Sequence, residues 1–178
     1  GIDPVFMPIA KGLSSGSQPI SGVMIHDRIA DTLVDIGGEL QHGFTYSGHP
    51  VASAVALENI NILQREGIVD KVGAETGPYF QARLRELVDH PLIGEVRGIG
   101  LMAAVEIVED KATRKPFDGS KNAGMLVREE AWSRGLLVRA TGDSMVMSPP
   151  LVMTRADVDE LITALTQALD AAEPILRG

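Results

Sequence analysis

The sequence contains no cysteine and few aromatic residues. The absence of cysteine among its 178 residues excludes disulfides and thiolate metal sites. Phenylalanine, tryptophan and tyrosine make up 4% of the chain, so aliphatic side chains and alanine must fill the core. Hydrophobic residues account for 44% and charged residues for 22%, which is typical of globular proteins. The composition therefore predicts a globular protein without covalent cross-links.

Basic residues and long apolar runs are also scarce. Sixteen basic and twenty-four acidic residues give a net charge of −8, which argues against a surface that binds nucleic acid or anionic membranes. No apolar run approaches the ~20 residues needed to span a bilayer, and no signal peptide is visible. We therefore expect a cytoplasmic, acidic α/β protein that binds neither nucleic acid nor membranes.

Two short apolar runs, residues 5–10 and 20–25, open the chain. Neither run alternates with polar residues, so both are predicted to be strands buried in a parallel sheet that helices cover on both faces. Helices are predicted where apolar residues recur every three to four positions and where residues typical of helix ends flank them.

One such end is a capping-box pattern at Thr154 and Asp157. The helices are expected over residues 26–36, 50–66, 68–88, 122–134 and 154–172.

The pattern changes after His90 and Pro91. Residues 96–108 are predicted to form one strand entered through a Gly-x-Gly turn, and a hairpin is expected over 136–149. The fold class is therefore α/β: residues 1–93 are predicted to belong to a larger parallel α/β domain, and residues 94–178 to form a small α+β domain.

Lys11 is the only charged residue between Pro4 and His26. A lysine that follows a buried strand has little solvent to stabilise its charge. Desolvation lowers the pKa of a lysine and frees the neutral amine, which attacks carbonyl groups. The alternative is a lysine that reaches the edge of the sheet and keeps its charge in water. From the residues alone, this second interpretation is the commoner one.

Residues 42–50, HGFTYSGHP, place hydroxyl groups before a predicted helix. Helix N-termini attract anions, so Thr45, Ser47 and backbone amides are candidates for binding a phosphate. The alternative is that Thr45 or Ser47 caps the helix. His42 and His49 have no acidic partner at ligand spacing, so no metal site is expected.

Arg139 interrupts the apolar run at residues 136–140. A buried guanidinium is costly unless it is paired. A substrate carboxylate, bound bidentately, would serve as the partner, and so would an ion pair to Asp143 across the turn. Gly98 and Gly100 form only half of a dinucleotide-binding pattern and precede no helix, so they are interpreted as a turn.

Taken in order, these segments resemble the class III, pyridoxal-phosphate-dependent aminotransferases of fold type I. IAKGLSSGSQPISGVM is similar to the family's cofactor-lysine segment, and HGFTYSGHPVASAVALENI to its phosphate loop and helix. RGIGLMAAVEI and GLLVRATGDSMVMSPPLVMTRADVDELI are similar to its C-terminal domain. Within the family, the likeness is strongest to aminotransferases that move an amino group from an ω-amino acid or diamine to pyruvate.

The resemblance implies a role for each candidate residue. Lys11 would bind pyridoxal phosphate covalently and then act as the general acid and base. Thr45, with Phe44 beside it, would bind the cofactor phosphate of the neighbouring subunit. Arg139 would bind the carboxylate of the acceptor. The resemblance therefore implies a homodimer with its site at the interface, an amine donor and a keto-acid acceptor as substrates, and no metal.

Two departures from the family qualify this expectation. Ser17 stands where relatives commonly have an aromatic residue, and the chain is less than half as long as family members. The resemblance places the aspartate that pairs with the pyridine nitrogen, the aromatic that stacks on the ring and a Gly-Ser phosphate turn in a missing N-terminal part. We therefore expect a C-terminal fragment that is inactive alone.

Two alternatives to this function remain at the level of the sequence. The first is another class III member, such as an ornithine, acetylornithine or diaminopelargonate aminotransferase, or an aminomutase. The second is a fragment without catalysis that has only a folding or interaction role.

Overall fold

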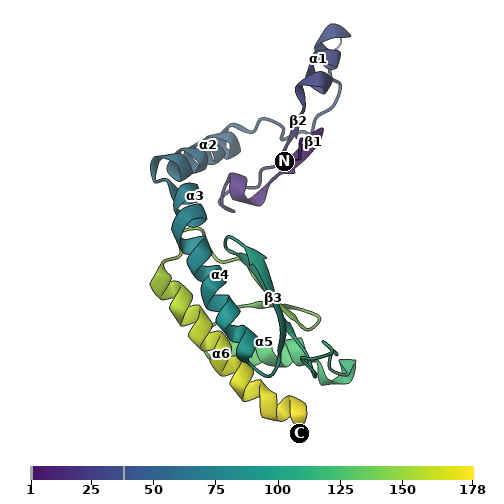
Figure 1. Ribbon diagram of the computed structural model, residues 1–178. Coiled ribbons are helices and arrows are strands. Elements are labelled where there is room, and N and C mark those ends of the chain that lie inside the picture. Colours follow the sequence, from purple (N-terminus) through teal and green to yellow (C-terminus); the bar gives the residue numbers. More distant parts are fainter. Residues whose placement is uncertain (1, 38) are drawn as a thin grey trace. The chain divides into compact units, whose positions relative to one another are not determined.

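The computed structural model describes residues 2–37 and 39–178 (Figure 1). The chain divides into two compact units, Gly1–Gly67 and Ile68–Gly178. Both units combine helices with short antiparallel sheets, in agreement with the predicted α/β class. No helix within the described residues is long and apolar enough to cross a membrane.

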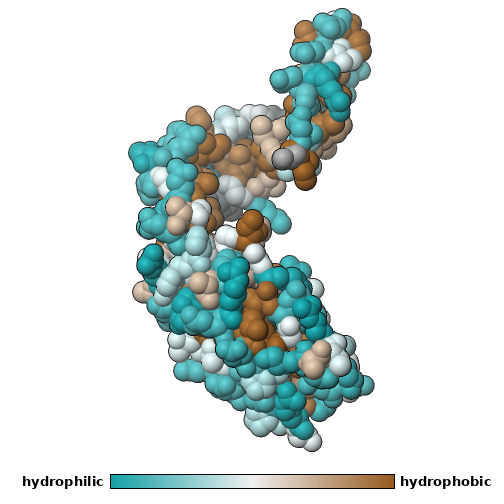
Figure 2. All heavy atoms as spheres, viewed as in Figure 1, coloured by the Kyte–Doolittle hydropathy of each residue, from teal (hydrophilic) through white to brown (hydrophobic). Residues whose placement is uncertain are grey.

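Two strands of the first unit, β1 (Phe6–Ile9) and β2 (Gly22–Ile25), form an antiparallel pair in which Phe6 lies opposite Ile25. The prediction of buried strands in a parallel sheet is therefore wrong for this chain. The segment between them, residues 10–21, contains only a short 3-10 turn and not the α-helix that usually connects parallel strands. Val23 is 58% exposed, and Figure 2 shows hydrophobic residues on the visible surface of both units.

Both α-helices within the described residues of the first unit have a histidine as their N-cap residue. The Nδ1 atom of His26 accepts a hydrogen bond from the Arg28 N–H at the start of α1 (Asp27–Asp35). The helix α2 (Pro50–Arg65) has its proline in the first turn, where the missing N–H costs no hydrogen bond. A short 3-10 turn, η1 (Lys11–Leu13), follows β1 and contacts α2. The helices predicted at 26–36 and 50–66 are confirmed.

One four-stranded antiparallel sheet organises the second unit. Its order is β3-β4-β6-β5, with bounds Ile93–Ile99, Met102–Ile107, Ser144–Met147 and Arg139–Thr141. The turn predicted at Gly98 and Gly100 is confirmed, but the prediction of one strand over 96–108 is wrong, because β3 and β4 form a hairpin around that turn. Gly100 has φ of +57° at the turn, a conformation that glycine adopts without steric cost. The amide of Gln81 donates to the carbonyls of Gly100 and Met102 and so fastens this turn.

Helices cover the sheet of the second unit. A continuous helical run comprises α3 (Ile68–Lys71), a π segment (Val72–Thr76), α4 (Gly77–Arg85) and a 3-10 turn (Glu86–Asp89). The chain continues with α5 (Ala123–Ser133) and α6 (Arg155–Arg177). The helices predicted at 68–88, 122–134 and 154–172 are confirmed, and so is the capping box at Thr154 and Asp157.

The core of the second unit lies between these helices and the sheet. Phe80 and Leu84 of α4, Val105 and Met145 of the sheet, and Leu165 of α6 have no exposed surface. In Figure 1, α4 and α6 lie side by side, so the helical run before residue 93 packs with the second unit. The division of the whole protein into domains 1–93 and 94–178 stays a prediction.

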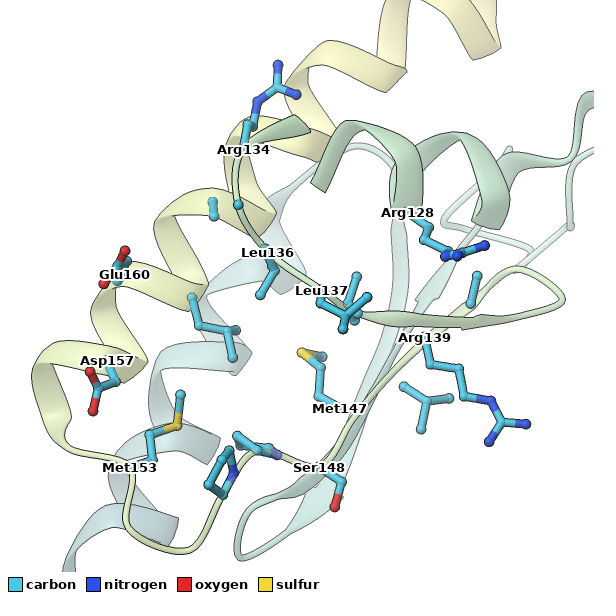
Figure 3. Close-up of a pocket in the computed structure, with 18 residues that line it drawn as sticks. Arg128, Arg134, Leu136, Leu137, Arg139, Met147, Ser148, Met153, Asp157 and Glu160 are labelled. Atoms are coloured by element: carbon cyan, nitrogen blue, oxygen red, sulfur yellow. The ribbon is translucent and has the colours of Figure 1, made fainter. Parts of the chain in front are cut away.

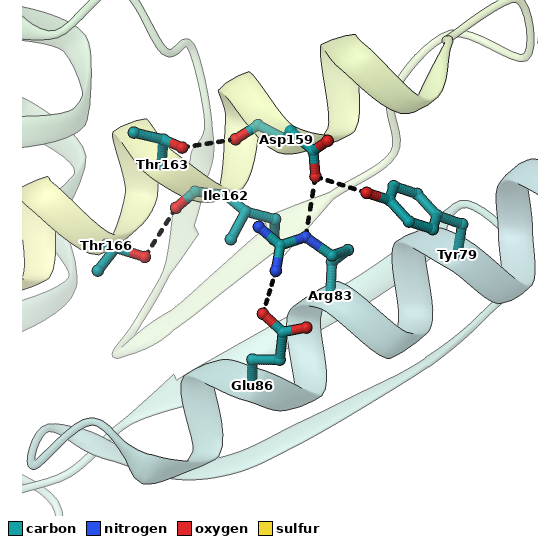
Figure 4. Close-up of polar contacts among 7 residues, drawn as sticks. All are labelled: Tyr79, Arg83, Glu86, Asp159, Ile162, Thr163 and Thr166. Atoms are coloured by element: carbon teal, nitrogen blue, oxygen red, sulfur yellow. Dashed lines mark hydrogen bonds and ion pairs between the residues drawn. The ribbon is translucent and has the colours of Figure 1, made fainter.

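A polar network joins α4 to α6 (Figure 4). Asp159 accepts hydrogen bonds from the Tyr79 hydroxyl at 2.7 Å and from Arg83 Nε at 2.9 Å. The guanidinium of Arg83 also pairs with Glu86, and that of Arg155 lies 5.0 Å from the centre of the Tyr79 ring. The hydrogen bond from Tyr79 holds the pKa of Asp159 below its ordinary value, and the same bond raises the pKa of Tyr79.

This network predicts an acid-sensitive contribution to stability. The pKa of Asp159 is lowered from 3.8, so its stabilising effect is complete above pH 3.8 and is lost as the pH falls through the lower folded value. We expect Asp159→Asn to unfold at a lower temperature than the wild type at pH 7, with a difference that shrinks below pH 3.8.

Thermal unfolding followed by circular dichroism checks this expectation. Glu160→Gln is the matched control, because it removes the same charge from the adjacent position of α6 and the described chain gives its side chain no ion pair. A difference between Asp159→Asn and the wild type that is the same at every pH would contradict the account.

Candidate functional site

Lys11 is the first residue of η1, directly after β1 and Ala10. Its φ is +46°, and Ser15 in the same segment has φ of +49°. A left-handed backbone is uncommon outside glycine and costs about 1–3 kcal/mol, so it persists only where surrounding contacts impose it. Of the two interpretations of Lys11, the structure of this chain fits the one that keeps the charge in water, because its side chain is exposed. Residues of the first unit therefore do not supply the expected desolvation.

The segment that contains Lys11 is bound to α2 by the side chain of Asn59. The Asn59 Nδ2 atom donates to the carbonyl oxygens of Gly12 at 2.9 Å and Leu13 at 3.2 Å. The Ser15 hydroxyl donates to Asn59 Oδ1 at 2.7 Å. Sequence reasoning missed Asn59, because no local pattern links it to residues more than forty positions away.

The loop before α2 is organised differently from the capping arrangement considered for the sequence. His49 caps α2, and its Nδ1 atom accepts from the Ala52 N–H at 3.3 Å. The hydroxyl of Ser47 accepts from the Phe44 N–H at 2.9 Å and closes the turn inside the loop. Thr45 is exposed, and its hydroxyl makes no hydrogen bond within the described chain.

An open cavity of about 870 Å³ lies beside this loop in the first unit. It is lined on one side by residues 18–21, which follow residues 11–15, called here the Lys11 turn. On the other side it is lined by Phe44 and residues 46–49. Its volume lies within the range of ~300–1,000 Å³ that is common for small-molecule sites. The structure thus brings the segment after Lys11 and the loop around Phe44 to one cavity.

Arg139 lies on β5, an edge strand of the second unit's sheet. The predicted burial of this side chain is wrong: Arg139 is exposed, and it makes no ion pair within the described residues. Asp143, the alternative partner, instead accepts a hydrogen bond from the Gly124 N–H at 3.1 Å. Lys11, Phe44 and Thr45 belong to the first unit, whereas Arg139 belongs to the second.

A second cavity, of about 810 Å³, borders Arg139 within the second unit (Figure 3). Its walls include the apolar side chains of Leu136 and Met147. In Figure 3 the guanidinium of Arg139 extends away from Asp157 and Glu160, which lie at the opposite side of the cavity. The guanidinium is therefore available for an anion from outside the unit.

Comparison with known proteins decides the family. The sequence model of the family Aminotransferase class-III matches residues 1–169. The chain belongs to the class III aminotransferases. This membership confirms the resemblance inferred from the segments around Lys11, Thr45 and Arg139, and pyridoxal phosphate is the cofactor that the family uses.

Two curated relatives and one solved structure illustrate the similarity. The chain is 56% identical to the putrescine–pyruvate aminotransferase of Pseudomonas aeruginosa, over 96% of this chain and 37% of that protein. It is 42% identical to the diaminobutyrate–2-oxoglutarate transaminase of Halomonas elongata, over 96% of this chain and 37% of that protein. The PMP-bound aminotransferase of Vibrio fluvialis matches with a TM-score of 0.92 and 35% identity, over 98% of this chain and 39% of that one.

The chain spans about 37% of the length of these two curated relatives. The residues that it does contain fit pyridoxal phosphate: the amine of Lys11 is exposed, and Gly12 has no atom within 4 Å of the position that a Cβ would occupy. A flat group can therefore approach the backbone beside the lysine. Thr45 adds an exposed hydroxyl in the loop that borders the cavity.

Gly124 of α5 packs closely against Gly142 in the turn between β5, the strand that carries Arg139, and β6. A Cβ at Gly124 would overlap the carbonyl oxygen of Gly142. We expect Gly124→Ala to destabilise the chain by about 1–3 kcal/mol, the usual cost of overpacking. Urea unfolding measures the change, with Gly119→Ala as the control because no atom lies within 4 Å of its Cβ position. Equal stability of the two variants would contradict the account.

Proposed function

We propose that the whole protein is a cytoplasmic homodimer that transfers an amino group from an ω-amino acid, a diamine or another amine to pyruvate. Its active site would lie at the subunit interface. The 56% identity to a putrescine–pyruvate aminotransferase supports this acceptor. The observation that carries the proposal is the exposed Lys11 in a left-handed turn, within the segment that matches the family.

Lys11 holds pyridoxal phosphate through its Nζ atom in this proposal. When bound, the cofactor supplies an electron sink for the carbon that loses a proton. Once the amine donor had displaced it from the cofactor, the free Nζ amine would take the proton from the donor carbon that bears the nitrogen and return it on the other side of that nitrogen. The backbone of the Lys11 turn orients this atom, so its geometry matters to both roles.

Thr45 and Phe44 contribute to phosphate binding in the neighbouring subunit. The hydroxyl of Thr45 is exposed and has no partner within the described chain, so it can donate to a phosphate oxygen. The loop leads into α2, a helix of 16 residues whose N-terminus attracts negative charge. Phe44 lines the adjacent cavity.

Arg139 binds the carboxylate of the acceptor. Its guanidinium is exposed on an edge strand, and two parallel N–H donors match the geometry of a carboxylate. An amine donor without a carboxylate at this position forms no ion pair with Arg139. Arg139 would therefore serve the acceptor half of the reaction and move away for the donor.

Substitution of Lys11 tests the proposal most simply. In the whole protein, Lys11→Ala should abolish the absorbance band of lysine-bound pyridoxal phosphate, because no other amine takes its place. Lys71→Ala, at an exposed lysine of the second unit, should retain the band. A borohydride-reducible link between protein and cofactor in Lys11→Ala would show that the assignment is wrong.

Substitution of Arg139 separates the two halves of the reaction. Arg139→Ala should lower kcat/KM for pyruvate by roughly 10- to 100-fold, the loss expected for a hydrogen-bonded charge pair. The kcat/KM of the first half-reaction with a diamine should stay unchanged, because a diamine has no carboxylate. Stopped-flow half-reactions measure both values, and an equal loss for the two substrates would contradict this role.

The similarity to a diaminobutyrate–2-oxoglutarate transaminase favours a second candidate acceptor, 2-oxoglutarate. A panel of amine donors assayed with pyruvate and with 2-oxoglutarate distinguishes the two. Preference for 2-oxoglutarate would favour another class III activity, such as that of an ornithine, acetylornithine or diaminopelargonate aminotransferase. Absence of transfer with either acceptor would favour an aminomutase or a role in folding or interaction alone.

A further inference from the structure

Asn59 is the residue of α2 whose side chain reaches the Lys11 turn. Its amide donates to the carbonyl oxygens of Gly12 and Leu13 and accepts from the Ser15 hydroxyl. The bonded groups are therefore the three residues at positions one, two and four after Lys11. Both donor and acceptor atoms of the amide are used, so its orientation is set by its partners.

The Lys11 turn needs such a restraint because its backbone is strained. Lys11 has φ of +46° and Ser15 has φ of +49°, and each left-handed residue costs energy that surrounding contacts must offset. Ser14, between them, is buried and donates to the Gln18 carbonyl at 2.6 Å. Asn59 supplies the contacts that connect this strained turn to a helix.

We infer that Asn59 is a positioning residue for Lys11: it holds the turn in the backbone conformation that directs the lysine amine toward the cofactor. The inference rests on the proposed role of Lys11. A lysine held in one conformation forms its link to the cofactor without first losing conformational freedom, and such preorganisation tightens binding. Asn59 does not itself touch the cofactor in this role.

Asparagine suits this task better than its isosteres. Leucine has a similar volume but neither donates nor accepts a hydrogen bond. An aspartate carboxylate would accept from Ser15, but it would also place negative oxygens against the carbonyls of Gly12 and Leu13, where a donor is needed. Only the amide satisfies all three partners at once.

The test is a double-mutant cycle on the whole protein, with pyridoxal phosphate as the probe. In the Lys11 background, Asn59→Leu should raise the Kd for pyridoxal phosphate roughly tenfold, because the lysine link loses its preorganisation. In a Lys11→Ala background the same substitution should leave the Kd unchanged, since there is no lysine to position. Absorbance of the lysine-bound cofactor and quenching of protein fluorescence give the two sets of Kd values.

Asn61→Leu is the matched control. Asn61 lies on the same helix, is exposed, and has no side-chain hydrogen bond within the described residues. This control should leave the Kd unchanged in both backgrounds. Ser15→Ala removes only one of the three bonds to Asn59 and should raise the Kd less than Asn59→Leu. If Asn59→Leu does not fold, Ser15→Ala in the same cycle decides the question.

The outcomes separate this inference from the proposed function. A rise in Kd of the same factor in both backgrounds would show that Asn59 acts through the general structure, and the inference would be wrong. An unchanged Kd in the Lys11 background would also overturn it. Retention of a covalent cofactor link in Lys11→Ala would instead overturn the proposed role of the lysine.

Discussion

The hydrogen bonds between Asn59 and the Lys11 turn are the interaction on which the candidate site depends. Ser14, Ala52 and Ala56 are the only buried residues among those described in the first unit. Apolar packing inside the unit therefore contributes little to its order, and specific polar contacts must set the backbone of the turn. The three bonds to one amide do so, and they also connect the lysine segment to α2.

The second unit, unlike the first, is held together mainly by apolar packing. Its sheet and helices enclose a continuous apolar core, and two glycines allow elements to approach closely. A Cβ at Gly98 would overlap the carbonyl of Met102, and one at Gly124 would overlap that of Gly142. This rigid scaffold places Arg139 on an edge strand, where its guanidinium remains exposed. A carboxylate-binding role needs both properties: a fixed strand and a free side chain.

Local signals explain which parts of the fold could be predicted. Pro50 in the first turn of α2 and the Thr154–Asp157 capping box act within a few residues, and both helices were predicted from them. The turn at Gly98 and Gly100 was predicted from its glycines, but the β3–β4 hairpin was missed because the sequence did not show that residues before this turn form a strand of their own. The antiparallel pairing of β1 with β2 depends on which strand lies beside which, and apolar runs alone do not specify that.

The sequence could not determine whether the side chains of Lys11 and Arg139 are buried. It left both burial and exposure open for Lys11 and suggested burial for Arg139, because neighbours in the sequence do not determine what covers a side chain in space. Both are exposed in this chain, which spans about 37% of its curated relatives. The family, in contrast, could be inferred because the segments around Lys11, Thr45 and Arg139, each only moderately specific alone, occur together and in the family's order.

The central claim is that Lys11 is the amine that holds the cofactor. Reduction of the whole protein with borohydride in the presence of pyridoxal phosphate, followed by peptide mass mapping, tests it directly. The account predicts one modified lysine, in the peptide that contains IAKGLSSGSQPISG. Modification of a different lysine, with this peptide unchanged, would contradict it.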